Sequence, residues 1–210
     1  HAHLTLQELV DGMRERNNLV IYNHPYWSRT DICDIVDLKN IVGMEIYNHN
    51  CEASWKCGNS EVFYEHFLWH QNYIWCFGTD DAHGGTEDYC GGYITVKTDD
   101  FSHKGIIEAI EKGSFFASAA REGEEAPKIL DFYVEDGIAK IWCEPCRDIF
   151  LFAGRGEYPR VGNDSSHVHA KRQEPATYLE LKLSGDAKYV RATLRDFNGN
   201  ITWGQPIRLK

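Results

Sequence analysis

Hydrophobic residues in the first 120 positions follow two alternating patterns. Some segments repeat apolar residues every three or four positions, which predicts amphipathic helices, and others are short continuous apolar runs, which predict buried strands. In the helical segment at 5–18, Thr5 and Glu8 have the spacing of a capping box. Helical patterns cover 5–18, 60–71 and 102–113, a weaker one covers 31–40, and strand patterns cover 19–22, 42–48, 73–78 and 93–99.

The alternation of strands and helices in this part of the chain predicts a parallel sheet or barrel. In such folds the residues that bind ligands gather in loops at the carboxyl ends of the strands. His24, His49, Asp81 and His83 each follow a predicted strand closely. We therefore expect these four side chains at one edge of the sheet.

The pattern changes to a period of two after Pro127. Segments of 127–210 alternate apolar and polar residues and are interrupted by Asp-Gly and Asn-Gly dipeptides, which are typical of β-hairpin turns. The sequence therefore predicts two domains, an α/β domain over 1–120 and a small antiparallel, β-sandwich-like domain over 127–210, with a linker over 120–127.

The stretch GTDDAHG at 78–84 places two acids and a histidine directly after an apolar run. Because Asp81 and His83 are two positions apart, both can face one ion if the segment is extended or turning, and this pair of side chains suits zinc, iron or manganese. A metal ion there would lower the pKa of water and polarise a phosphoryl or carbonyl oxygen. The alternative is that an aspartate caps a turn and His83 lies on the surface.

The end of the first predicted strand carries YNHPYWSR at 22–29. Proline restricts the residue before it to extended geometry, so we expect the backbone of His24 to be fixed in that form. Tyr26, Trp27 and Arg29 are candidate pocket residues, and Arg29 suits a phosphate or carboxylate through bidentate pairing. It is equally open that the aromatic side chains pack beneath the edge of the sheet and that His24 is a half-buried structural histidine.

Four motifs, in chain order, resemble those of PHP-domain metallohydrolases, the polymerase and histidinol phosphatase superfamily: LVIYNHPYW, GMEIYN, FGTDDAHG and GSFFASAAREG. A later stretch, YVRATLRDFNGNITWGQPIRL, is similar to the last strands of the β domain in the branch of carbaryl-hydrolase-like proteins and PHP phosphoesterases. The resemblance implies a distorted (β/α)7 barrel with a site for two or three metal ions. It implies that His24, Asp81 and His83 are metal ligands, and we expect Glu45 and His49 in the shell behind them.

The chain departs from the family at its start. Family members open with a strand that ends in His-x-His-Thr, and further histidine and glutamate ligands follow, but no such region precedes the helix at 5–18. His1 or His3 matches a family histidine that precedes this helix, and we take His3 as the candidate ligand; a tag remnant is the other interpretation. We therefore expect the carboxyl-terminal part of a PHP barrel with some of its ligands missing.

Composition limits the partners of the chain. The formal net charge of −10 disfavours nucleic acid and anionic membranes, and no apolar run reaches membrane-spanning length. The seven irregularly spaced cysteines favour reduced thiols and the cytoplasm. Cys143 and Cys146 have the Cys-x-x-Cys spacing of a zinc or redox pair, but we expect two ordinary strand-end cysteines.

These observations favour a metal-dependent hydrolase that acts on a small phosphate ester through water activated by zinc, manganese or iron. We expect Asp81 and Arg29 to be catalytic, and Tyr26, Trp27 and Arg29 to contact the substrate. Two alternatives stay open. The same site could hydrolyse a carbamate or carboxylic ester, or an incomplete metal site could leave a non-catalytic binding or structural protein.

Overall fold

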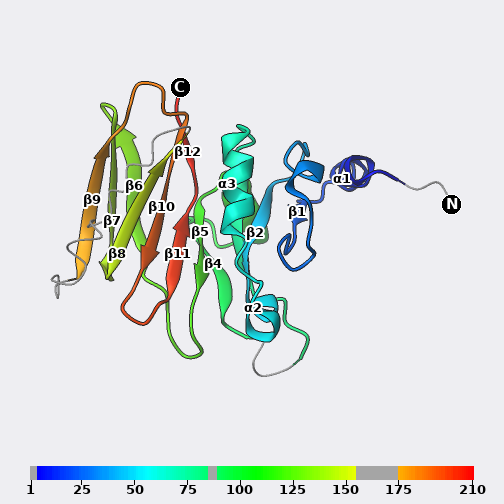
Figure 1. Cartoon of the computed structure of the whole chain (residues 1–210), viewed down its shortest axis with the longest axis horizontal. Helices are drawn as coiled ribbons and strands as arrows, with labels where there is room; N and C mark the ends of the chain where they lie inside the picture. The colour runs from blue at the N-terminus through cyan, green and yellow to red at the C-terminus, as the bar shows by residue number, and fades with distance from the viewer. Residues whose placement is uncertain (1–3, 85–88, 155–174) are drawn as a thin grey trace.

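The computed structural model describes residues 4–84, 89–154 and 175–210, in which strands outnumber helices (Figure 1). No helix in these ranges is long and apolar enough to span a membrane. The helices are α1 (Leu6–Arg14), α2 (His49–Trp55), α3 (Glu61–Trp69), α4 (His103–Glu111) and the short 3-10 helix η1 (Ile32–Asp34).

Three short strands from the first half of the chain form a parallel sheet, here called sheet A. Its strands are β1 (Ile21–Tyr22), β2 (Gly43–Asn48) and β3 (Trp75–Thr79), in that order across the sheet. The central strand β2 pairs in parallel with both neighbours. The carboxyl ends of all three strands therefore share one edge, here called the carboxyl edge.

Two antiparallel sheets make up most of the rest of the structure. Sheet B contains β4 (Gly92–Val96), β5 (Phe115–Ala119), β8 (Asp148–Ala153), β10 (Tyr189–Arg195), β11 (Ile201–Gly204) and β12 (Ile207–Arg208). Sheet C contains β6 (Ile129–Glu135), β7 (Ile138–Cys146) and β9 (Ala176–Lys182). Figure 1 shows sheet A and α1 towards one end of the molecule, and sheet C at the other.

The predicted α/β fold, the carboxyl-terminal part of a distorted (β/α)7 barrel, is wrong. Parallel pairing ends at β3 because the Gln205 side chain occupies the next position: it accepts from the backbone N–H of Cys76 and donates to the Cys76 carbonyl, both at 2.9 Å. The following strand, β4, pairs antiparallel with β5, and the other edge of β5 is taken by β11. The described residues therefore form small separate sheets that do not close into a barrel.

Sheet B crosses the boundary that the sequence predicted between 1–120 and 127–210. β11, near the end of the chain, pairs with β5, so that Ile201 lies opposite Ala119. Trp203 on β11 is fully buried in the same hydrophobic cluster as the core residues of sheet A. A second cluster fills the space between sheet C and the strands β8 and β10.

Local signals at the first helix agree with the structure, and two later elements were not predicted. The capping box at Thr5 and Glu8 is confirmed, since each side chain accepts from the other residue's backbone N–H. Helix α2 begins directly at the end of β2, where the Asn48 side chain accepts from the Cys51 N–H. Asparagine is one of the residues preferred at a helix N-cap, yet the hydrophobic pattern predicted no helix directly after Asn48 and no strand at 115–119.

A buried arginine joins α3 to sheet B. Arg191 on β10 is 2 % exposed and pairs with Glu61 and Glu65 on α3, while its guanidinium also donates to Thr193 and lies over the ring of Phe152. The nearby carboxylates raise the pKa of Arg191 against the opposing effect of its burial. Because α3 packs on β2, this ion cluster fixes sheet A against sheet B.

Replacing Arg191 by Met should lower the free energy of unfolding by about 3–5 kcal/mol, since it leaves two partly buried carboxylates without their cation. Urea denaturation of the purified chain measures the change. Lys182→Met, at an exposed position on β9, is the control and should stay within about 0.5 kcal/mol of the unmodified chain. A loss below about 1 kcal/mol for Arg191→Met would contradict the role given to this cluster.

Candidate functional site

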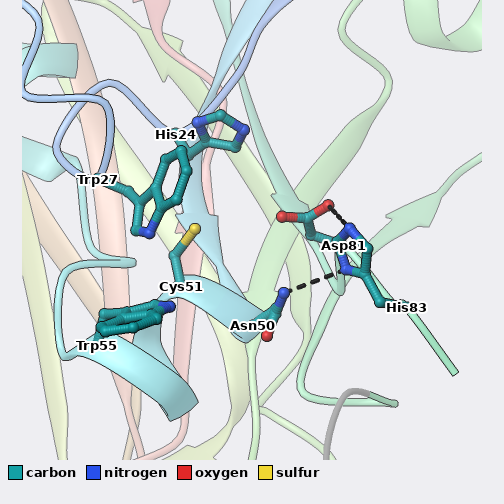
Figure 2. Close-up of a pocket in the computed structure, with 7 residues that line it drawn as sticks. All are labelled: His24, Trp27, Asn50, Cys51, Trp55, Asp81 and His83. Atoms are coloured by element: carbon teal, nitrogen blue, oxygen red, sulfur yellow. Dashed lines mark hydrogen bonds and ion pairs between the residues drawn. The ribbon is translucent and has the colours of Figure 1, made fainter. Parts of the chain in front are cut away.

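The carboxyl edge of sheet A carries a pocket of about 290 Å³. Its walls come from the three segments that follow the three parallel strands, because the chain turns away from the sheet at each strand end. Figure 2 shows Asp81 and His83 on one side of the pocket and the two indole rings on the other. The lining residues are His24, Trp27, Asn50, Cys51, Trp55, Asp81 and His83.

A buried glutamate beneath the pocket ties the three strand ends together. Glu45 on β2 is 3 % exposed. Its carboxylate accepts from the His24 backbone N–H after β1 at 2.7 Å, from the Asn48 amide at the end of β2 at 3.0 Å, and from the Thr79 hydroxyl at the end of β3 at 2.7 Å. Each carboxylate oxygen therefore has a donor from a neighbouring strand, and the positions of the loops above depend on this one side chain. We call this arrangement the Glu45 clamp.

Asp81 and His83 lie next to each other in the loop after β3. The Asn48 amide, which also belongs to the Glu45 clamp, donates to Asp81 Oδ2 at 3.1 Å. Asp81 Oδ1 lies 3.9 Å from Nε2 of His83, and the other ring nitrogen of His83 lies 3.2 Å from the Asn50 amide. The carboxylate is thus held from below, while the imidazole stays largely exposed, with 68 % of its side-chain surface accessible.

His24 occupies a turn with an unusual backbone. The expectation of extended geometry before proline is wrong, because the φ angle of His24 is 33°. Its N–H donates to Glu45, its carbonyl accepts from the Ser28 N–H at 3.0 Å, and its Nδ1 lies 2.9 Å from the Ser28 hydroxyl. These contacts hold a conformation that a non-glycine residue adopts only at a cost of about 1–3 kcal/mol. Asp81 also has a positive φ, 53°, so two of the seven lining residues have left-handed backbone conformations. A neighbouring side chain contacts each of them: Ser28 for His24 and Asn48 for Asp81.

Asp80 and His49 support the loops and do not line the pocket. The Asp80 carboxylate accepts from three successive backbone N–H groups at 90–92, at 2.8–2.9 Å, which is the turn-capping role considered for an aspartate in this motif. The ring of His49 lies 3.2 Å from the Tyr47 hydroxyl and packs against Gly91, where a Cβ atom would come within 2.0 Å of the imidazole. His49 therefore packs behind the pocket and is not part of its lining.

The other candidate residues fall into different places. Trp27 lines the pocket, whereas Tyr26 and Arg29 are exposed and do not line it. His3 lies outside the described residues. The structure thus brings His24, Trp27, Asp81 and His83 together in one pocket. Arg29 and Tyr26, which we expected to contact the substrate, do not line this pocket.

The predicted metal-binding group is wrong for the described part of the chain. Within 4–84, 89–154 and 175–210, no group of three or more His, Cys, Asp or Glu side chains is placed to hold a metal ion. The physical reason lies in their hydrogen bonds. His24 and His83 are each directed towards a neighbouring Ser or Asn side chain. A site for two or three ions, as the family resemblance implied, therefore does not fit these donors.

The hydrophobic pattern of the sequence did not predict helix α2, and three residues that line the pocket were therefore not among the predicted site residues. Asn50, Cys51 and Trp55 follow β2 directly, and the same strand-end rule that selected His24 and Asp81 would have selected this segment. Burial, together with the negative charge of Asp81, raises the pKa of the Cys51 thiol to about 12. This shift disfavours the reactive thiolate form of Cys51 near neutral pH. No protein-family model, curated protein or solved structure matches the chain.

Replacing Glu45 by Gln should loosen the Glu45 clamp, because one end of the amide then places an NH2 group against a donor. The expected loss in the free energy of unfolding is about 1–3 kcal/mol. The amide hydrogen of His24 should also exchange with solvent faster, which NMR measures directly. The exposed Glu122→Gln is the matched control and should change neither quantity. Unchanged protection of the His24 amide in Glu45→Gln would rule out the clamp.

Proposed function

We propose that the chain is a hydrolase that acts on a small phosphate ester in the pocket at the carboxyl edge of sheet A. One observation carries the proposal: His24, Asp81 and His83 come from two strand ends and line the same pocket, which is held from below by the Glu45 clamp. Carboxylate and imidazole side chains in one pocket are the usual groups for proton transfer at a reacting ester. The motif resemblance to PHP metallohydrolases supports the same reaction class.

In this proposal Asp81 and His83 act together. Asp81 keeps its orientation through the Asn48 amide, and His83 is exposed enough to exchange protons with water. A water molecule would attack phosphorus as the bond from phosphorus to the alcohol oxygen breaks. Asp81 would take the proton that the water loses, and His83, 3.9 Å away, would give a proton to the departing oxygen. His24, on another wall, would donate to a phosphate oxygen. Arg29 is left out of this assignment because it does not line the pocket.

We also propose that the reaction uses a divalent metal ion, zinc, manganese or iron, which would bind together with the substrate. Mg²⁺ is usually bound by one or two carboxylates together with substrate phosphates, and of the three proposed ions Mn²⁺ is the one that suits oxygen ligands in the same way. Asp81 and the phosphate of the ester could share such an ion without any group of three protein ligands. When bound, the ion would neutralise phosphate charge and polarise the phosphoryl oxygen. Binding of metal alone is accordingly expected to be weak, and turnover slow.

Two further expectations belong to the proposal. The substrate is a small molecule, since the net charge of −10 opposes nucleic acid and anionic membranes. We also propose a cytoplasmic location, which is supported by seven cysteines that are all free thiols. Cys143 and Cys146 are part of that set, with their sulfur atoms 3.8 Å apart in the core between sheets B and C.

Asp81→Asn should lower the turnover of p-nitrophenyl phosphate in the presence of Mn²⁺ or Zn²⁺ by about 100-fold or more, because it removes the anionic group and nearly preserves shape. Asp99→Asn, at an exposed position outside the pocket, is the matched control and should keep full activity. A chelator should abolish turnover in the unmodified chain, and added metal should restore it.

The result that contradicts the proposal is equal turnover by Asp81→Asn and the control. Turnover of p-nitrophenyl acetate or a p-nitrophenyl carbamate, with none of the phosphate, would favour the carbamate and carboxylic ester alternative. Inactivity towards all three esters, with a folded chain, would favour a non-catalytic binding protein.

A further inference from the structure

Two exposed tryptophans form the apolar side of the pocket, and the proposed hydrolysis gives them no role. Trp27 is 45 % exposed and Trp55 is 68 % exposed. Large aromatic side chains gain more than other residues from burial, so leaving two of them accessible in one pocket is costly. By contrast, Trp203 in the core is fully buried.

The tryptophans reach the pocket from different segments. Trp27 lies in the loop after β1, where its ring meets that of His24 edge to face at 5.1 Å, and Trp55 is the last residue of α2. Figure 2 shows both indoles on the side of the pocket away from Asp81 and His83, with the Cys51 side chain near them. One wall of the pocket is therefore aromatic, and the facing wall is polar and ionisable.

This division matches an ester with two unlike ends. We infer that the substrates are phosphate esters whose alcohol part is a compact planar aromatic group, with the phosphate at Asp81 and His83 and the ring against Trp27 and Trp55. The inference rests on the proposed function and names its substrate class. Aromatic rings stack on indoles in offset or edge-to-face geometry, which a saturated ring cannot reproduce. The pocket volume of about 290 Å³ suits a small ester.

The test compares benzyl phosphate with cyclohexylmethyl phosphate. Their leaving groups have similar size and acidity, and only the first is planar and aromatic, so intrinsic reactivity does not decide the outcome. We expect kcat/KM to favour benzyl phosphate by ~10-fold, the scale of one aromatic stacking contact. Trp55→Leu should reduce this preference to near one, whereas Trp55→Phe, which keeps a ring, should retain most of it. Phe101→Leu is the control, because Phe101 is 92 % exposed and lies outside the pocket lining.

A binding measurement separates the claim about the aromatic substrate class from the claim that the chain is a hydrolase. It uses calorimetry in the presence of Mn²⁺ with the non-hydrolysable analogues benzylphosphonate and cyclohexylmethylphosphonate. Equal hydrolysis of both esters, unchanged in Trp55→Leu, would overturn the substrate class and leave the hydrolase standing. Preferential binding of benzylphosphonate that needs Trp55, without hydrolysis of either ester, would support the ligand class and overturn the hydrolase. If neither ester reacts and neither phosphonate binds, both claims fail.

Discussion

The Glu45 carboxylate is the constraint on which the carboxyl edge of sheet A depends. β1 is only two residues long, and its pairing with β2 leaves the loop after it with little support from the sheet. The Glu45 clamp supplies that support, because one buried side chain accepts from the ends of all three strands. A buried carboxylate is expensive unless it is hydrogen-bonded, so the clamp forms only when the three strand ends are in place together.

Packing against the rest of the chain turns this local arrangement into a stable pocket. The Gln205 amide bonds to the outer edge of β3 as a strand would, and the Arg191 cluster fixes α3, which covers β2. Tyr47 on β2 stacks on the buried ring of Trp203 from β11. The last strands of the chain thus support the sheet that presents the pocket, although they contribute no residue to its lining.

The sequence predicted individual elements better than their assembly. Apolar periodicity and a capping box identified α1, α3 and α4 and the three strands of sheet A, since these signals are local. Local signals of this kind do not show whether the strands close into a barrel. Whether a fourth parallel strand joins β3 is decided by Gln205, which lies 129 positions from Cys76 in the chain. Long-range hydrogen bonds of single side chains leave no periodic pattern.

The candidate site was predictable to a similar extent. The rule that ligand-binding residues follow strand ends selected His24, Asp81 and His83, and the structure lines one pocket with them. The same rule could not reveal that Arg29 points elsewhere, because its φ of 53° depends on the turn formed around Ser28. It also could not exclude a metal group, since the orientation of each imidazole depends on hydrogen bonds to Ser28 and Asn50.

The central claim is that this pocket binds a phosphate group. A crystal structure of the chain with benzylphosphonate and Mn²⁺ tests it most directly. The account predicts phosphonate density between His24, Asp81 and His83, with the benzyl ring towards Trp55. Phosphonate bound only elsewhere, for example among Lys188, Arg208 and Lys210 in the basic pocket beside Tyr73, would contradict it.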